Sequence, residues 1–109
     1  MVTFNYTEEF LRQAKRLAKH YHSLADDLDA LQHELMDNPN TGIDLGVGKH
    51  KIRLAVKSKK RGKSGGMRVI TLVVVVDPDD TCVNLLTLYD KKEISNVSDQ
   101  YIDQIIKNL

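Results

Sequence analysis

KHKIRLAVKSKKRGKSGGMRVITLVVVVDPDDTCVNLLTLY, residues 49–89, is the stretch that decides the fold. Residues 49–56 alternate between charged and apolar side chains, which predicts a strand with one apolar face. Residues 67–76 are rich in β-branched side chains and are apolar on both faces after the first positions, as expected of a central strand. A third strand at 82–89 follows a turn at 77–80. Three adjacent strands in this order predict an antiparallel meander.

The segment before this stretch predicts a short strand and two helices. Residues 2–6 alternate as a strand does, and Thr7 followed by two glutamates is typical of a helix start. Apolar residues then recur at three- and four-residue spacing, which predicts the first helix. Ser23 is expected to begin a second helix, with Asp26 as a shortened capping box, and that helix ends at the sequence NPNTG.

Ser98 is expected to cap a short C-terminal helix that has apolar residues on one side. Two helices joined by a short connection predict an antiparallel hairpin whose apolar face the sheet must cover. The sequence therefore predicts a single α+β domain over residues 1–109. Its parts are a short N-terminal strand, an antiparallel helical hairpin, a three-stranded antiparallel meander and a short C-terminal helix.

Several classes of protein are disfavoured by the sequence. No stretch approaches the roughly 18 to 20 apolar residues of a membrane helix, and MVTFNYTEEF lacks the layout of a secretory signal, so we expect a cytoplasmic protein. GKSGG at 62–66 lacks the first glycine of a phosphate-binding P-loop and precedes a predicted strand rather than a helix. The four histidines have no acidic or cysteine partners at ligand spacing. We therefore expect no cofactor and no metal.

The net charge of +1 hides a strong segregation of charge along the chain. Residues 1–44 carry four basic and eight acidic side chains, and residues 77–109 carry three and seven. Residues 45–76 contain no Asp or Glu and nine basic side chains: Lys49, Lys51, Arg53, Lys57, Lys59, Lys60, Arg61, Lys63 and Arg68. Such a segment produces a local positive field that attracts a polyanion, although a solvated lysine-rich loop gives the same composition.

Part of this basic segment has a spacing suited to phosphate. Lys51 and Arg53 are two residues apart on one predicted strand, so both side chains leave the same face, roughly 6 to 7 Å apart. Arg68 opens the next strand and joins them if the two strands pair, and Lys91 and Lys92 lie just beyond the third strand. In RNA the 2′-hydroxyl attacks the adjacent phosphorus, so a protein without a metal has only to stabilise charge and help move two protons.

The sequence NPNTG, followed by KIRLA, GKSGGMRVI, LLTLYDKKE and a short last helix, resembles the RelE/ParE toxin superfamily, and within it the RelE and HigB-like branch. The similarity covers nearly the whole chain. It implies a RelE-like fold and a toxin of a type II toxin–antitoxin system, which enters the ribosomal A site and cleaves mRNA there. It also implies two partners besides mRNA, which are the ribosome with its rRNA and a cognate antitoxin protein.

The resemblance implies roles for single residues. Lys51 and Arg53 match the basic pair on the second strand of the family, which orients RNA and assists proton transfer. Arg68 matches the arginine that stabilises the phosphoryl charge. Lys92 falls where RelE-like toxins have another arginine, and a lysine there lacks the bidentate guanidinium fork, which makes Lys91 the alternative.

The sequence departs from the family pattern at Ser98, where RelE proteins have a catalytic tyrosine. A serine is a poor acid or base and suits the start of a helix. Tyr89 and Asp90 are candidates to replace that tyrosine, since HigB-like members build the site differently, and Tyr89 is equally suited to pack beside the sheet. Met67 stands where RelE proteins often have an aromatic residue, which reduces base stacking.

The loop KSKKRGKSGG at 57–66 is predicted to be mobile and exposed, which does not suit precise chemistry. We expect it and the strand before it to hold RNA or the ribosome by salt-sensitive attraction. The basic residues expected to do so are Lys49, Lys57, Lys59, Lys60, Arg61 and Lys63.

Three functions remain open from the sequence. The first is a ribosome-dependent, metal-independent endoribonuclease toxin that inhibits translation. The second is a ParE-like toxin that inhibits DNA gyrase, against which the basic triad Lys51, Arg53 and Arg68 counts. The third is a catalytically weak RNA-binding relative, which the absence of the family tyrosine keeps open.

Overall fold

Five strands form one mixed sheet in the computed structural model, which describes residues 1–59 and 66–109. The strand order across the sheet is β1-β5-β4-β3-β2. β1 is parallel to β5, and the other neighbours are antiparallel. The strands are β1 (Val2–Tyr6), β2 (Ile43–Gly46), β3 (Lys49–Leu54), β4 (Met67–Asp77) and β5 (Asp80–Asp90).

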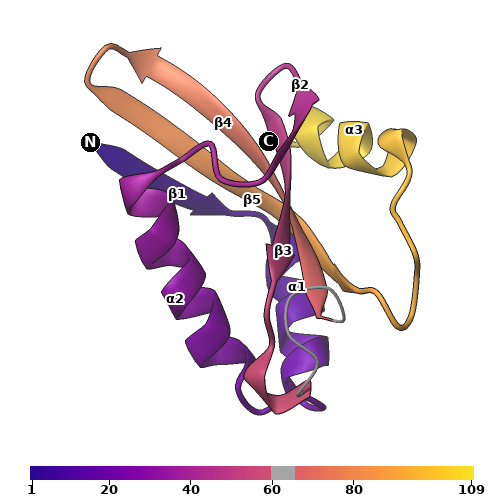
Figure 1. The fold of residues 1–109 in the computed structure, drawn as a ribbon. Coiled ribbons are helices and arrows are strands. Elements are labelled where there is room, and N and C mark those ends of the chain that lie inside the picture. The colour runs from indigo at the N-terminus through magenta and orange to yellow at the C-terminus, as the bar shows by residue number, and fades with distance from the viewer. Residues whose placement is uncertain (60–65) are drawn as a thin grey trace.

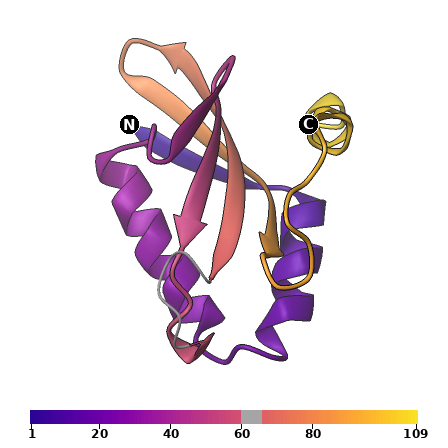
Figure 2. The ribbon, with the colours of Figure 1, turned by 45° about the vertical axis from the view of Figure 1, so that its right-hand side comes forward.

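Helices cover both faces of this sheet (Figures 1 and 2). α1 and α2 form a hairpin on one face, whereas α3 lies on the other face near the end of the chain. The helices are α1 (Glu8–Ala18), α2 (Leu24–Asp37) and α3 (Asp99–Lys107), with a short 3-10 helix η1 (Lys57–Lys59). Within the described ranges, no helix has both the length and the apolar composition needed to cross a membrane.

The core has one part on each face of the sheet. The larger part lies between the sheet and the α1–α2 hairpin and includes Phe10, Leu17, Leu24, Leu35, Ile52, Leu54, Val56 and Val69. The smaller part lies under α3 and is built from Ile70, Leu86, Tyr89 and Ile102. Val69 and Ile70, which are neighbours in β4, thus enter opposite parts of the core. This confirms that the first half of β4 is central in the sheet and apolar on both faces.

The α+β class predicted from the sequence is confirmed, and the three strands of the expected meander are β3, β4 and β5. Two features of the sheet were not predicted. β2 was missed because its four residues are all exposed and because glycines at positions 42, 46 and 48, in and beside it, are typical of a loop. The parallel pairing of β1 with β5 joins segments about 79 residues apart, as between Val2 and Thr81, and no local pattern reports such a contact.

Three details of the prediction were wrong. β3 ends at Leu54 rather than at residue 56, because the chain turns there into η1. The side chain of Ser23 makes no capping bond at the start of α2, and its Oγ instead donates to Asp27 Oδ2 at 2.7 Å. The far end of β4 is not buried: β3 starts opposite Leu72, the Val73 N–H still donates to the Gly48 carbonyl oxygen at 2.8 Å, and Val74, Val75 and Val76 beyond it are exposed.

An extra residue interrupts the pairing of β4 with β5. Ile70 pairs with Thr87 and Thr71 pairs with Leu85, so Leu86 has no partner in β4. A bulge of this kind changes which side chains face each side of the strand. Because of it, Leu88 faces the helical hairpin while Tyr89 lies on the α3 face, opposite Arg68.

Thr7 holds this bulge to the start of α1. Its Oγ1 donates to the carbonyl oxygen of Leu86 at 2.7 Å and accepts from the backbone N–H of Phe10 at 3.0 Å. The same hydroxyl therefore caps α1 and satisfies the carbonyl of the extra residue.

Replacing Thr7 with Ala is expected to lower the free energy of unfolding by about 1 to 2 kcal/mol, because a helix cap and a part-buried hydrogen bond are lost together. Thr7→Ser retains the hydroxyl and is the matched control. Urea unfolding followed by circular dichroism measures both variants. Equal stability of Thr7→Ala and the parent protein would contradict the double role of this hydroxyl.

Candidate functional site

Two arginines face each other across β3 and β4. Arg53 and Arg68 are direct partners in the register of the two strands, so their side chains leave the same face of the sheet. Arg53 is exposed, whereas Arg68 is 7% exposed, and its Nη1 donates to the carbonyl oxygen of Met67 at 3.1 Å. Like charges directly opposite one another disfavour strand pairing, and here the register nevertheless brings two guanidinium groups to one position on the sheet face.

Lys51 and Tyr89 complete a cluster on that face. Lys51 lies two residues before Arg53 on β3, and Tyr89 is the β5 partner of Arg68. The Lys51 ammonium donates to Asn96 Oδ1 at 2.9 Å, and the Tyr89 hydroxyl donates to the same oxygen at 3.2 Å. The structure therefore brings together four of the residues singled out in the sequence. We call Lys51, Arg53, Arg68 and Tyr89 the basic cluster.

Lys49 lies at the start of β3, and Lys91 and Lys92 lie in the turn after β5, so all three are close in sequence to members of the basic cluster. Lys91 and Lys92 are exposed in the turn after β5, where the Lys91 Nζ donates to the carbonyl oxygen of Ser95 at 3.3 Å. Lys49 is half-buried, and its Nζ lies 3.7 Å from an Asp103 carboxylate oxygen on α3. Lys49 therefore joins α3 to the sheet, whereas Lys91 and Lys92 remain exposed.

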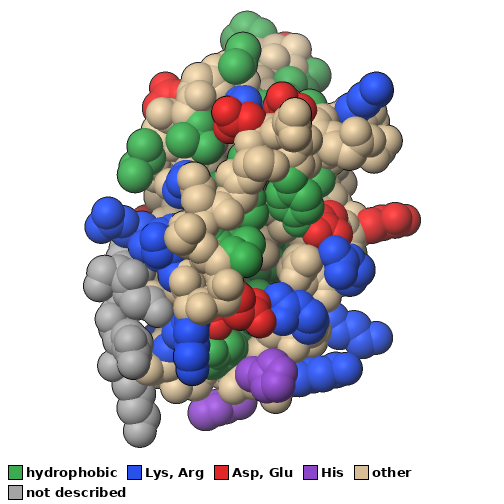
Figure 3. All heavy atoms as spheres, turned by 90° about the vertical axis from the view of Figure 1, so that its right-hand side faces the viewer, with side chains coloured by type: hydrophobic (Ala, Val, Ile, Leu, Met, Phe, Trp, Pro, Cys, Tyr) green, Lys and Arg blue, Asp and Glu red, His purple; other side chains and the backbone are tan. Residues whose placement is uncertain are grey.

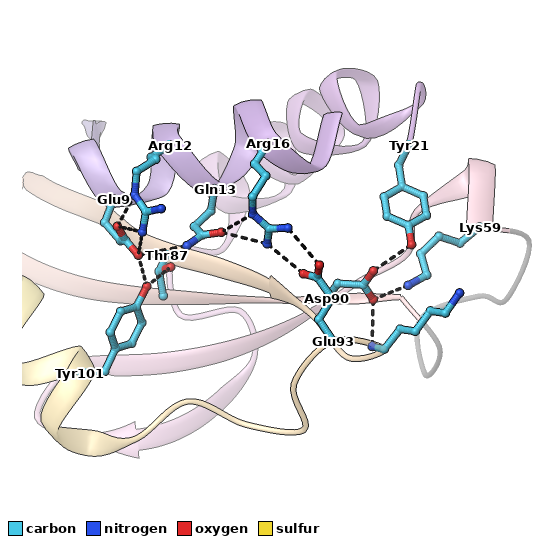
Figure 4. Close-up of polar contacts among 11 residues, drawn as sticks. Glu9, Arg12, Gln13, Arg16, Tyr21, Lys59, Thr87, Asp90, Glu93 and Tyr101 are labelled. Carbon is cyan, nitrogen blue, oxygen red and sulfur yellow. Dashed lines mark hydrogen bonds and ion pairs between the residues drawn. The ribbon is translucent and has the colours of Figure 1, made fainter. Parts of the chain in front are cut away.

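Asp90 lies next to Tyr89 but faces the opposite side of the sheet. It is 2% exposed, its Oδ2 accepts from the Tyr21 hydroxyl at 2.8 Å, and its Oδ1 accepts from the backbone N–H of Lys92 at 2.9 Å and from the Lys59 ammonium. Figure 4 shows these contacts converging on one carboxylate from three elements of the chain. Asp90 is therefore a structural anchor and does not join the basic cluster.

Burial and hydrogen bonding act on Asp90 in opposite directions. Burial raises the pKa of its carboxyl, but the hydrogen bonds from Lys59, the Lys92 backbone and Tyr21 favour the ionised form. The bonds prevail, and the pKa of Asp90 lies below its ordinary value. The carboxylate therefore stays charged and paired at neutral pH.

The basic loop divides into described and undescribed parts. Lys57 is exposed in η1, whereas the Lys59 side chain is 5% exposed, is paired with Asp90 and lies 5.0 Å from the centre of the Tyr21 ring. The prediction of an exposed loop residue is therefore wrong for Lys59, because its partner and the Tyr21 ring are supplied by distant parts of the chain. The other predicted loop contacts, Lys60, Arg61 and Lys63, lie outside the described residues.

The Tyr89 hydroxyl has a defined protonation state in this setting. Burial raises the pKa of this phenol, and the positive charge of Arg68 opposes the rise only in part. A phenol whose pKa is raised above 10 keeps its proton at neutral pH. It is therefore suited to donate a proton to a leaving group and unsuited to remove one.

A groove of about 510 Å³ adjoins the basic cluster between α1 and the connection from β5 to α3. Tyr89 and Asn96 form part of its wall. Across it, the Arg16 guanidinium of α1 binds the Glu93 carboxylate with an Nη2–Oε1 distance of 2.8 Å (Figure 4). Figure 3 shows lysine and arginine side chains gathered over the lower half of this side of the molecule, at the level where α1 ends.

Ser98 and Asn96 show what the sequence signalled and what it did not. The Ser98 Oγ accepts from the backbone N–H of Tyr101 at 3.1 Å, which confirms its predicted role as the cap of α3. Asn96 was not predicted, because nothing in the sequence distinguishes it from any other asparagine in a connecting segment. Only its contacts with Lys51 and Tyr89 in the folded protein do so. In the described part of the chain, no group of three or more His, Cys, Asp or Glu side chains could hold a metal ion.

Comparison of the chain with models of protein families and with curated proteins found no match.

Replacing Asp90 with Asn is expected to lower the free energy of unfolding by about 3 kcal/mol at pH 7, because the buried Lys59 ammonium loses its counter-charge. Glu93→Gln is the matched control: it breaks an ion pair whose side chains are 44% and 45% exposed and is expected to cost under about 1 kcal/mol. Urea unfolding measures both. A cost for Asp90→Asn no larger than that of the control would contradict the structural role of the buried pair.

The same pair predicts how stability depends on pH. Because the pKa of Asp90 is lowered in the folded protein, its contribution is complete above the unfolded carboxyl pKa of about 4 and is lost as the pH falls through the lowered value. The stability difference between the parent and Asp90→Asn should therefore shrink in acid. A difference that stays constant down to about pH 2 would rule out this linkage.

Proposed function

We propose that this chain is a RelE-like toxin of a type II toxin–antitoxin system, a metal-independent endoribonuclease that cleaves mRNA in the ribosomal A site and so inhibits translation. The observation that carries the proposal is the pairing of Arg53 with Arg68 in register, with Lys51 and Tyr89 on the same face. This arrangement concentrates positive charge on a sheet face that the helical hairpin leaves uncovered. The resemblance in sequence supports the same assignment.

The basic cluster suits the charge that develops during RNA cleavage. The 2′-oxygen forms a bond to phosphorus, the bond from phosphorus to the 5′-oxygen breaks, and negative charge grows on the phosphoryl oxygens. Arg53 offers its fork of donors to these oxygens. Arg68 acts from a buried position, where the lower dielectric makes its charge more effective than that of an exposed side chain.

The two protons of the reaction need separate routes. The proton of the 2′-hydroxyl passes to solvent water as that oxygen attacks, and the 5′-oxygen takes up a proton as it departs. Tyr89 retains its proton at neutral pH and is our candidate donor to the 5′-oxygen. In this assignment Tyr89 takes the catalytic role of the tyrosine that RelE proteins have where this chain has Ser98.

The partners follow from the same charge distribution. Lys57, Lys91 and Lys92 are exposed and suit contacts with ribosomal RNA, along with the predicted Lys60, Arg61 and Lys63. An antitoxin that keeps the toxin inactive would place acidic side chains over the basic cluster. In this proposal the protein acts in the cytoplasm, where ribosomes and nascent mRNA are found.

Added to a translating extract, the purified protein is expected to produce new mRNA 5′ ends inside codons, and only when ribosomes are present. Arg53→Ala and Arg68→Ala should each slow the cleavage by about 10²-fold or more, because each removes a donor aimed at the developing charge. Primer extension measures the ends and their rate of appearance. Lys107→Ala, an exposed lysine at the end of α3, is the control for loss of positive charge.

Other outcomes distinguish the alternatives. Arrested DNA supercoiling by gyrase without cleavage would indicate a ParE-like toxin. Salt-sensitive binding to RNA or ribosomes without cleavage would indicate a catalytically weak relative. Cleavage by Arg68→Ala at the parental rate would overturn the mechanism proposed for the basic cluster.

A further inference from the structure

Asn96 joins two parts of the basic cluster that do not pair directly. Its Oδ1 accepts a hydrogen bond from Lys51 on β3 at 2.9 Å and one from Tyr89 on β5 at 3.2 Å. β3 and β5 each pair with β4 and not with one another. One carbonyl oxygen with two lone pairs thus links both outer strands of the meander across β4.

The backbone around Asn96 is held at both ends. On one side, the N–H groups of Glu93 and Ile94 donate to the Asp90 carbonyl oxygen at 2.9 and 3.1 Å. On the other side, Ser98 caps α3. The Asn96 amide is therefore presented to the cluster from a segment anchored to β5 and to α3.

We infer that Asn96 is a positioning residue of the basic cluster, which holds the Lys51 ammonium beside the Tyr89 hydroxyl in the arrangement needed for cleavage. The inference rests on the proposed function. It adds a residue outside the basic segment of the sequence, on the connection between β5 and α3.

A neutral acceptor is what this position requires. Lys51 has a flexible stem and lies beside two arginines, whose charges repel its ammonium toward solvent. An aspartate at this place would hold the ammonium but cancel part of the charge meant for phosphate. The Asn96 amide holds it and leaves the net charge of the cluster unchanged.

The bond to Tyr89 has a second effect. By accepting from the phenol, the Asn96 Oδ1 favours the protonated form of Tyr89 and fixes the direction of its hydroxyl. Removal of this acceptor should lower the pKa of Tyr89, and a carboxylate in its place should raise it. A residue that only supports the fold would shift this titration in neither direction.

The first test measures single-turnover cleavage on programmed ribosomes with Asn96→Ala, and with Ser95→Ala as the control in the same connection. Asn96→Ala is expected to slow cleavage by about 10²-fold, a cost typical of misplaced catalytic groups, with little change in the ribosome concentration that gives half the maximal rate. In a Lys51→Ala, Tyr89→Phe background, the further loss from Asn96→Ala should largely vanish, because Asn96 acts through those residues. Additive losses, or cleavage faster than the parent, would overturn the inference.

The second test does not need activity. The ultraviolet titration curve of the parent minus that of Tyr89→Phe isolates the Tyr89 phenol. The same difference, with and without Tyr89→Phe, is then measured in the Asn96→Ala and Asn96→Asp backgrounds. The pKa of Tyr89 is expected to be lowest in Asn96→Ala, intermediate in the parent and highest in Asn96→Asp. If the parent cuts no mRNA but this order holds, the proposed function fails and the positioning contact stands. If the three titrations coincide, the positioning role fails whatever the activity.

Discussion

The unpaired Leu86 in β5 is the constraint on which the rest of this molecule depends. Regular alternation would send Tyr89 to the side of the helical hairpin with Leu85, and the extra residue reverses this. Tyr89 then faces Arg68, and Asp90 faces the hairpin, where it meets Tyr21. A single irregularity thereby separates the basic cluster from the acidic anchor next to it in sequence.

The two sides of β5 use charge in different ways. On the hairpin side, the Lys59 and Asp90 charges neutralise each other in a buried pair, and the Asp90 carboxylate also accepts from the Tyr21 phenol and the Lys92 backbone N–H. On the α3 side, Arg53 and Arg68 stand opposite each other, and the neighbouring Lys51 and Tyr89 both donate to the neutral amide of Asn96. The buried acid of this region therefore stabilises the fold on the hairpin side, whereas the positive side chains of the basic cluster lie on the α3 side.

Much of the fold was readable because its signals are local. Alternation in 49–54 separates Ile52 from Arg53 by face, and the cap residues Thr7 and Ser98 fix where α1 and α3 begin. The spacing of Lys51 and Arg53 likewise predicted a shared face, and the pairing of β3 with β4 placed Arg68 there. Asn96 and the burial of Lys59 were not readable, because their partners lie 45 and 31 residues away in the chain.

The sequence by itself determined the α+β class, the strands of the meander and the concentration of positive charge in residues 45–76, since periodicity and composition are properties of neighbouring residues. The tertiary structure alone decided where those charges lie relative to one another and to their partners. It placed Lys59 in an ion pair, set Arg53 opposite Arg68 and turned Tyr89 toward them through the bulge at Leu86. Register and burial depend on contacts between distant segments, and those contacts exist only once the chain has packed.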